Sequence, residues 1–389
     1  MRKIILTLGL IVSNLSFGQT YTGVQDPSQQ ENAIQRILSG NVKGGVVVGG
    51  YGEVTYGEPL GEELGEIDVQ RMVLLFGYQF NEKTQFVTEI ELEHVNEVFV
   101  EQALLSHAIN DDLNVRAGLM LVPMGIINEY HEPTTFNGVF RPAVDKSIVP
   151  TTWREVGVGV NGNLQNVSLR YQAYIFNGLI SNSDNVGGTS YLGGKNALRN
   201  GRQKGAKSVA NNMNLSIKVD YYGMPGLRVG LSGYYGETSP ETTEEASKTG
   251  STVDLSMLGL DFRYRRNRFS SRGQYIYTGI GGAAAYNNLT GSDLGSSLQG
   301  WYLESAYNLM PLSKNQVLDA FVRYENYNTH HTVTNLAVNN SYDRSDWIAG
   351  ISYHISPGAV VKLDYTFKDN AVVDDEGSQN LNMGIGVWF

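Results

Sequence analysis

Alternation of apolar and polar residues recurs along most of this chain and constrains its fold more than any other feature. From Met213 to Tyr221 every odd position is apolar or aromatic, and from Asn212 to Asp220 every even position is polar or charged. Successive side chains of a β-strand point to opposite faces, so each such segment predicts a strand with one apolar and one polar face. We predict sixteen such strands, at residues 44–56, 67–80, 84–93, 98–109, 113–121, 154–163, 167–176, 211–222, 226–236, 252–265, 268–279, 299–309, 317–327, 343–354, 359–369 and 379–389.

The connections between these segments fall into two classes. Those after even-numbered segments are mostly short turns, such as Asn110-Asp111-Asp112 and Ser356-Pro357-Gly358, whereas those after odd-numbered segments are generally long and polar. An even number of antiparallel strands with short turns at one end and long loops at the other is typical of bacterial outer-membrane barrels. A soluble sandwich would not separate its connections in this way. We therefore predict an all-β fold, a transmembrane outer-membrane β-barrel of about 16 antiparallel strands over residues 44–389.

The composition and the last segment agree with a barrel. The chain has 45 glycines, 23 tyrosines and only 10 prolines, a composition that fits many twisted strands with aromatic girdles. In the last segment Leu381, Met383, Ile385 and Val387 share one face, and the chain ends on Phe389, which resembles the C-terminal signature of outer-membrane barrels. The chain contains no cysteine and therefore no disulfides, although an exported protein could form them. Its net charge of -10 argues against nucleic acid as a partner.

The N-terminus has the features of a secretory signal peptide. Met1-Arg2-Lys3 precedes an apolar run over residues 4–12, and Ser16-Phe17-Gly18 is a small-x-small cleavage pattern. The apolar run is shorter than the roughly 20 residues that span a bilayer, so we predict cleavage after residue 18 rather than a membrane anchor. Residues 19–43 form a periplasmic leader, and the spacing of Ala33, Ile34, Ile37 and Leu38 predicts either a short amphipathic helix at the barrel mouth or a mobile leader.

If the apolar faces contact lipid, the opposite faces line the lumen, and the charges predicted there are grouped. The predicted pore-lining residues are an acidic file on the third segment and basic residues on the fifth to eleventh segments: Glu89, Glu91, Glu93, Arg116, Arg170, Lys218, Arg228, Arg263 and Arg272. A basic wall facing an acidic region would create a transverse field that orients polar solutes. Alternatively, these charges pair across strands and only keep the interior hydrated.

A long connection, residues 122–153, follows the fifth segment. Its prolines stiffen it, and its many apolar and aromatic residues would be poorly soluble outside the barrel, so we predict that it folds into the lumen as a constriction loop. An outer cap or a partner contact is the alternative. The predicted charged residues of the constriction are Glu129, His131, Glu132, Arg141, Asp145 and Lys146.

The same region carries a family resemblance. Ala117-Gly118, Pro123-Met124-Gly125, His131-Glu132-Pro133, the run from Phe136 to Pro142 and the run from Pro150 to Glu155 resemble porins of the phosphate-selective O/P type, especially Bacteroidetes members. The resemblance covers residues 101–162 and implies a sixteen-stranded porin that forms a trimer. Phosphate selectivity is not transferred, because this chain is acidic overall and lacks the dense basic ladder of that family.

We predict an outer-membrane porin of a Gram-negative cell, which lets ions and small hydrophilic solutes diffuse passively, with outer-membrane lipid around it. The alternative is a structural subunit of a larger outer-membrane complex for export, assembly or uptake. We expect no enzyme, because neither a G-x-S-x-G elbow nor an H-E-x-x-H motif occurs. We expect no cofactor and no metal either: the adjacent His330 and His331 are predicted at a polar loop tip without a third ligand.

Overall fold

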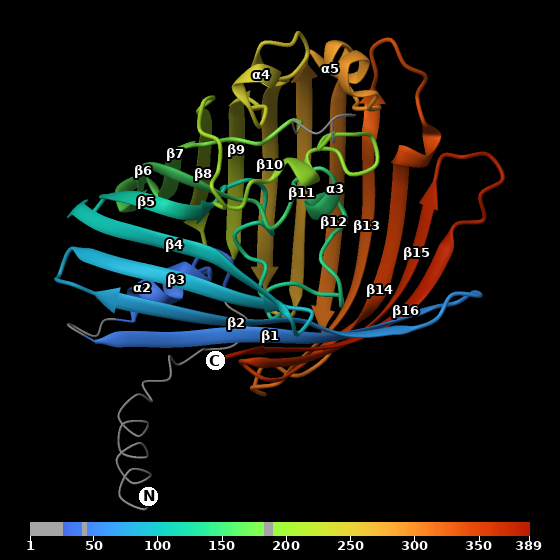
Figure 1. Ribbon diagram of the computed structural model, residues 1–389. Coiled ribbons are helices and arrows are strands. Elements are labelled where there is room, and N and C mark those ends of the chain that lie inside the picture. The colour runs from blue at the N-terminus through green and yellow to red at the C-terminus, as the bar shows by residue number, and fades with distance from the viewer. Residues whose placement is uncertain (1–25, 41–44, 183–189) are drawn as a thin grey trace, which may run out of the picture.

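The computed structural model describes residues 26–40, 45–182 and 190–389, so the predicted signal peptide lies outside the described residues. The chain forms a closed antiparallel barrel in which consecutive strands pair and β1 pairs with β16 (Figure 1). The predicted fold class is confirmed. The strands are β1 (Val46–Pro59), β2 (Glu66–Gln79), β3 (Thr84–Glu93), β4 (Glu97–Asn110), β5 (Leu113–Leu121), β6 (Arg154–Leu164), β7 (Leu169–Phe176), β8 (Asn214–Met224), β9 (Leu227–Glu237), β10 (Asp254–Arg266), β11 (Phe269–Gly281), β12 (Ser297–Asn308), β13 (Val317–Thr332), β14 (Asp343–Ser356), β15 (Ala359–Asn370) and β16 (Ser378–Trp388).

Each predicted segment corresponds to one strand, and the largest difference in length is at β13. The prediction ended this segment at residue 327, but the strand continues to Thr332, which pairs with Ser297 of β12. The added residues include His330 and His331, so the prediction that these two lie at a loop tip is wrong. The loop was predicted to begin at Asn328, but this residue still pairs with Gln299 of β12 and Asp343 of β14.

The barrel closes at the C-terminus. Tyr51 of β1 pairs with Trp388 of β16, and Gly50 exchanges two backbone hydrogen bonds of 2.9 Å with Phe389. Because every strand then has two neighbours, the described sheet has no free edge. Large apolar side chains such as Leu258 and Ile385 are exposed on the outer surface, and charged side chains such as Lys218 and Glu304 are buried inside.

The two ends of the barrel differ, as the connections predicted. We call the end with the short connections the turn end and the opposite end the loop end (Figure 1). At the loop end the long connections contain α4 (Thr243–Ala246) and α5 (Ala283–Thr290), which the sequence analysis did not predict. Three 3-10 turns, η1 (Gln165–Val167), η2 (Arg199–Gly201) and η3 (Asn340–Tyr342), complete the connections. Among the described residues no helix has the length and apolar character needed to cross a membrane.

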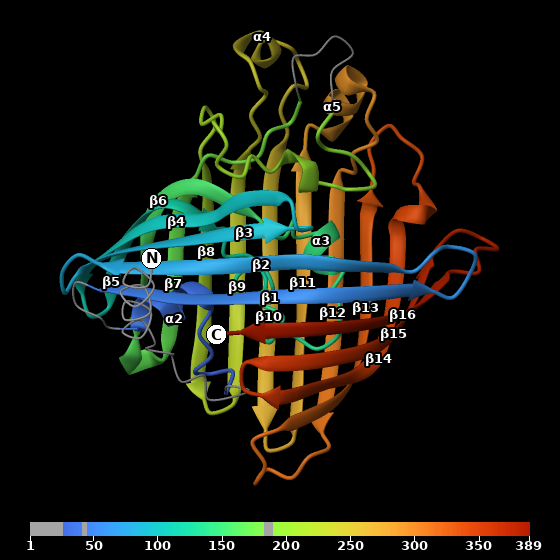
Figure 2. The same cartoon turned by 60° about the horizontal axis from the view of Figure 1, so that its bottom comes forward.

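A short helix, α2 (Ala33–Ser39), lies against the inner surface of the barrel near β1, β2 and β3 (Figure 2). Asn32 caps its first turn and forms a capping box with Gln35. Ile34 and Ile37 are buried, and the Arg36 guanidinium lies 4.4 Å from the centre of the Trp388 ring. The amphipathic helix predicted for the leader is therefore packed against the wall.

The long connection after β5, residues 122–153, folds into the lumen as predicted; we call it the inner loop (Figure 1). Its two ends are joined by Asn128, whose side chain donates to the carbonyls of Val122 and Trp153 at 2.7 and 2.9 Å and accepts from the Trp153 backbone N–H at 2.7 Å. A single turn of helix, α3 (Val144–Ser147), lies against β12 and β13. The ring of strands thus surrounds a compact segment.

Candidate functional site

The first part of the inner loop, residues 122–135, covers the wall formed by β3 to β9; we call this side the packed half. The Lys218 ammonium donates to the carbonyl of Gly125 at 2.5 Å and to the Glu129 carboxylate at 3.1 Å. Gln172 donates to the other oxygen of Glu129 at 2.8 Å. The Tyr130 hydroxyl accepts a hydrogen bond of 2.7 Å from Arg228. These wall groups hold the loop on both sides of its first turn.

Gly125 is required at that turn. Its φ of 65° lies in the left-handed region, and a Cβ atom there would lie 2.7 Å from Oε1 of Gln274. The same Gln274 oxygen accepts a hydrogen bond of 2.9 Å from the Ile126 backbone. The loop backbone therefore approaches β11 more closely than a larger residue would allow.

The second part of the inner loop, residues 136–150, lies against β12 to β16, on the side that we call the cavity half. Here charged wall groups bind the loop backbone. Lys362 donates to the carbonyl of Phe136 at 2.9 Å, Asp364 accepts from the backbone of Val139 at 2.5 Å, and Arg323 donates to the carbonyls of residues 137 and 140. Arg323 also pairs with the carboxylates of Glu304 at 3.2 Å and Glu325 at 2.8 Å.

Two cavities lie on the cavity half, one toward each end of the barrel. The loop-end cavity has about 570 Å³ accessible to water and is lined by residues of β1, β2 and β13 to β16, such as Glu66 and Asp68. The turn-end cavity has about 90 Å³ accessible to water and is lined by Pro27, Gln30 and residues of β10 to β14. Phe136 lines both, and its ring centre lies 3.8 Å from the Lys362 ammonium. The ring of Phe136 therefore lies between the two cavities.

The charges predicted to face the lumen lie inside the barrel, and many of them form ion pairs. Lys218 lies 3.1 Å from Glu129 and 3.9 Å from Asp261. Arg272 lies 2.9 Å from Glu304 on the neighbouring strand. Pairs of this kind join strand to strand and wall to loop. The pairing that the sequence analysis gave as an alternative is present for these residues.

Two further ion pairs join buried side chains of neighbouring or nearby strands. Arg263 lies 3.8 Å from Asp220, and Glu91 lies 3.2 Å from Arg71. Arg71 is also 2.7 Å from Glu53 of β1, so one guanidinium joins carboxylates on both neighbouring strands. Breaking such a pair inside a protein leaves an uncompensated charge, which makes these groups important for the stability of the wall.

The predicted pore-lining residues differ in how far the inner loop covers them. Glu89, Lys218 and Arg228 have no exposed surface, and Glu91 has 1%. Glu93, at the loop end of β3, is half-buried. The covered residues lie under the first part of the inner loop, which sequence parity alone does not reveal.

The remaining predicted basic residues have more open surroundings. Arg263 and Arg272 line the turn-end cavity, and Arg116 lines a smaller cavity with about 20 Å³ accessible to water. Arg170 donates to the Tyr130 hydroxyl and to the Gln35 side chain, each at 3.3 Å, and so connects the inner loop to the α2 region.

The six predicted charges of the inner loop divide between the two halves. Arg141, Asp145 and Lys146 line the loop-end cavity. Glu129 is bound to the packed wall, and the buried carboxylate of Glu132 has no hydrogen-bond partner among the described residues. The sixth, His131, points into the wall and is described with its neighbours below.

Burial changes the acidity of two loop residues. Burial raises the pKa of Asp145 to about 7, against the opposing effect of a 2.9 Å hydrogen bond from Gln274. Burial and the charge of Arg199 lower the pKa of Arg202 to about 9. Arg202 donates to the carbonyls of Pro150 and Thr152 and thereby ties the next long connection to the inner loop.

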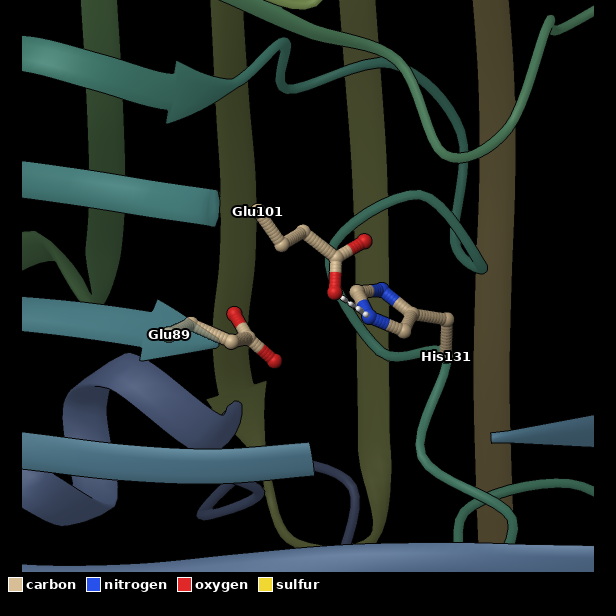
Figure 3. Close-up of side chains that lie close together, drawn as sticks. All are labelled: Glu89, Glu101 and His131. Carbon is tan, nitrogen blue, oxygen red and sulfur yellow. Dashed lines mark ion pairs between the residues drawn. The ribbon is translucent and has the colours of Figure 1, made fainter. Parts of the chain in front are cut away.

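The structure also brings together three residues that the sequence analysis did not group. Glu89 of β3, Glu101 of β4 and His131 of the inner loop each offer a ligand atom within 4.8 Å of the other two (Figure 3). Tyr51 of β1 touches all three. Glu101 was missed because strict alternation along β4 places it on the lipid side, and only local irregularity turns it inward. Glu304 was also missed, although the alternation along β12 places this charged residue on the inner face and could have predicted it.

Comparisons with known proteins agree with this architecture. No family model matches the chain. It is 32% identical over 350 residues to an "Uncharacterized protein" of Aquifex aeolicus (strain VF5), covering 84% of this chain and 77% of the relative.

Solved outer-membrane proteins share the fold at low sequence identity. The trimer form of OmpT of Vibrio cholerae has a TM-score of 0.55 at 12% identity, covering 90% of this chain and 100% of that one. The channel DcaP of Acinetobacter baumannii has a TM-score of 0.55 at 9% identity, and OmpF of Salmonella typhi in complex with daunomycin has 0.52 at 11%; each comparison covers 88% of this chain and 97% of the other. The chain has the fold of these outer-membrane barrels and belongs to the same family as the Aquifex aeolicus protein.

Proposed function

We propose that this protein is an outer-membrane porin through which ions and small hydrophilic solutes diffuse passively along the cavity half of the lumen. The observation that carries the proposal is the pair of cavities, with about 570 and 90 Å³ accessible to water, that meet at Phe136 from the two ends of the barrel. A small movement of this ring and of the loop backbone beside it connects them. Phe136, Lys362 and Arg323 then form the narrowest part of the path, and no catalytic group is needed.

The charges around the loop-end cavity support general diffusion rather than selection of one ion. Six basic and seven acidic side chains line it, and both signs occur on the wall and on the inner loop. A pore that selects by charge carries a ring or ladder of one sign at its constriction. The mixed lining therefore gives no support for the phosphate selectivity of the O/P porins that the inner-loop sequence resembles.

We propose the targeting, orientation and oligomeric state of the protein together with its porin function. The signal peptide at residues 1–18 is cleaved, the leader and the turn end face the periplasm, and the loop end faces the outside of a Gram-negative cell. The O/P resemblance and the trimer form of the similar OmpT barrel favour a homotrimer. The mass of the detergent-solubilised protein tests the trimer.

Among the predicted pore-lining residues, we propose that Arg263 and Arg272 contact solutes, because both line the turn-end cavity. The fully covered Glu89, Lys218 and Arg228 instead hold the inner loop against the packed wall. Arg141, Asp145 and Lys146 contribute the loop's own charges to the path.

The test is the single-channel conductance and reversal potential of the purified protein in a planar lipid bilayer across a salt gradient. Lys146→Glu combined with Lys368→Glu changes two exposed residues of the loop-end cavity and should shift the reversal potential toward cation preference. Lys195→Glu is the matched control, since this lysine is also exposed at the loop end but does not line the cavity. Equal shifts in both proteins would remove the loop-end cavity from the path.

A folded barrel that inserts into the bilayer but conducts nothing would contradict the porin proposal. It would support the alternative of a structural subunit in a larger outer-membrane complex. The packing of the inner loop and of α2 inside the lumen is the observation that favours this second function. Recovery of the barrel at constant stoichiometry with another outer-membrane protein would then identify the complex.

A further inference from the structure

Glu89, Glu101 and His131 lie close together between the wall and the inner loop (Figure 3), and Tyr51 contacts all three. Nε2 of His131 lies 3.4 Å from Oε2 of Glu101 and 2.8 Å from the Tyr51 hydroxyl, which donates to Oε1 of Glu89 at 2.8 Å. None of the four residues is more than 2% exposed. Within residues 26–40, 45–182 and 190–389, this is the one group of three or more His, Asp or Glu side chains with that spacing.

A β-bulge places the second carboxylate in this cluster. Glu89 pairs with Gln102 and the next residue, Ile90, pairs with Val100, so Glu101 is the extra residue of β4. Glu101 and Gln102 are both buried as a result, at 0% and 4% exposure. Without the bulge, the alternation along β4 would point Glu101 toward the lipid. Bulges that redirect a side chain are frequent beside functional sites.

The donor atoms are held in the orientation that a metal requires. Nδ1 of His131 donates to the carbonyl of Asn128 at 3.1 Å, since a carbonyl can only accept, and this leaves Nε2 facing the carboxylates. Metal-binding histidines almost always hold their other nitrogen in this way. Oε2 of Glu89 accepts a hydrogen bond of 2.6 Å from Gln102, which fixes the first carboxylate.

One carboxylate oxygen of the cluster is not satisfied by the described residues. Oε1 of Glu101 is buried and has no hydrogen-bond partner among the described residues. Burying a carboxylate beside a second one is unfavourable unless a positive charge compensates them. Two carboxylates match the charge of one divalent cation.

We infer that Glu89, Glu101 and His131 bind one divalent transition-metal cation, with the Tyr51 hydroxyl beside them, and that Zn²⁺ fits this site best. A tetrahedral zinc with bonds of about 2.0 to 2.1 Å separates its ligand atoms by about 3.3 to 3.4 Å, close to the spacing of the histidine nitrogen and the Glu101 oxygen. An imidazole with two carboxylates favours Zn²⁺ over Mg²⁺ or Ca²⁺, which prefer oxygen ligands alone.

The cation links two parts of the fold. Glu89 and Glu101 belong to the wall, whereas His131 belongs to the inner loop, so a bound ion clamps the loop to β3 and β4. The carbonyl of His131 accepts a hydrogen bond of 3.1 Å from Arg141, which lines the loop-end cavity. Arg141 therefore links the backbone of the site to the lining of the loop-end cavity. This role needs no assumption about conductance, because the ion stabilises the loop in any function of the barrel.

The experiment titrates Zn²⁺ into the mature protein after it has been folded in detergent and treated with EDTA. We expect one zinc per chain by mass spectrometry of the metal and a higher thermal unfolding midpoint in its presence. His131→Gln and Glu101→Gln should each weaken zinc binding by about 100-fold or more. His107→Gln is the matched control, since His107 lies on β4 but is exposed and bonded only to Thr84; it should bind zinc like the parent protein.

The loss of heat-dependent mobility in SDS electrophoresis shows which variants have not folded, and Co²⁺ supplies a readout on the unmodified protein. Cobalt bound to one imidazole and carboxylates in a tetrahedral site gives intense visible absorption bands, which zinc should abolish. Absence of these bands, zinc binding that survives both substitutions, or displacement of zinc by millimolar Mg²⁺ would each overturn the proposal.

Discussion

The packed half and the cavity half of the lumen contain the same kinds of charged residues but differ in what covers them. In the packed half, Lys218 and its partner Glu129 are sealed between the wall and the inner loop. In the cavity half, Arg323 has equally close partners, yet it also lines the loop-end cavity. A charged side chain points into the lumen because of its position in the alternation along its strand. Whether that side chain contacts water depends on whether the inner loop covers it.

The largest effect should come from breaking the central ion pairs of each half. Lys218→Met removes the cation that pairs with the buried carboxylates of Glu129 and Asp261. Arg323→Met leaves Glu325 without its ion-pair partner and Glu304 with Arg272 alone. Each should lower the free energy of unfolding by about 3 to 5 kcal/mol, measured by chemical denaturation in detergent. Only Arg323→Met should also raise the single-channel conductance, because it releases the loop beside the cavities. Equal conductance changes in the two variants would erase the distinction between the halves.

A smaller effect on stability, but a clear one on conductance, is expected at Phe136. Phe136→Ala removes the ring between the two cavities and should raise the single-channel conductance by about twofold. Phe176→Ala is the control, because Phe176 is equally buried on β7 in the packed half. The control should lose about 3 to 5 kcal/mol of stability with unchanged conductance. Unchanged conductance in Phe136→Ala would place the narrowest point elsewhere.

A pH dependence should follow from Asp145 in the cavity half. Burial raises the pKa of this carboxyl from 3.8 to about 7, so the folded state binds more protons than the unfolded state between these values. Its contribution to the free energy of unfolding should therefore fall as pH rises from about 4 to about 7 and stay constant above. Denaturation at several pH values should show a weaker dependence for Asp145→Asn. The reversal potential of the parent channel should also shift toward cations above about pH 7, and an identical shift in Asp145→Asn would exclude this residue as the cause.

The smallest effect is expected where a second connection holds the inner loop. Arg202→Gln loses the two hydrogen bonds to the carbonyls of Pro150 and Thr152 and should cost about 1 to 3 kcal/mol. Because the loop is also held by the wall, the mean conductance should remain, while brief closures in single-channel records become more frequent. Lys207→Gln, an exposed change on the same connection, is the comparison and should alter neither quantity.

Much of the fold followed from the alternation of residues. The bounds of β3 and β5 were predicted to the residue, because turn residues flank them and one face of each is apolar. The inner loop was predicted inside the barrel because its aromatic and apolar residues need burial. The extension of β13 past Tyr327 was not predicted, because it depends on pairing with Ser297 and Gln299 of β12 and Asp343 of β14, which local periodicity does not show.

The candidate site was predicted less completely, for a physical reason that Glu101 illustrates. Period two assigns a residue to the inner or outer face only while the strand is regular, and the bulge opposite Glu89 breaks the period by one residue. The sequence therefore named His131 and Glu89 but not the carboxylate that joins them. It likewise grouped Lys218 with Arg272, although the first is sealed and the second lines a cavity.

By itself, the sequence determined the number of strands, their two faces and the segment that folds inside, because burial of apolar surface and backbone hydrogen bonding act through local periodicity. Only the tertiary structure decided which lumenal charges are covered, where the cavities meet and which ligand atoms converge on His131. These depend on contacts between residues far apart in the chain, and small shifts in strand register or loop path change them without changing the pattern of the sequence.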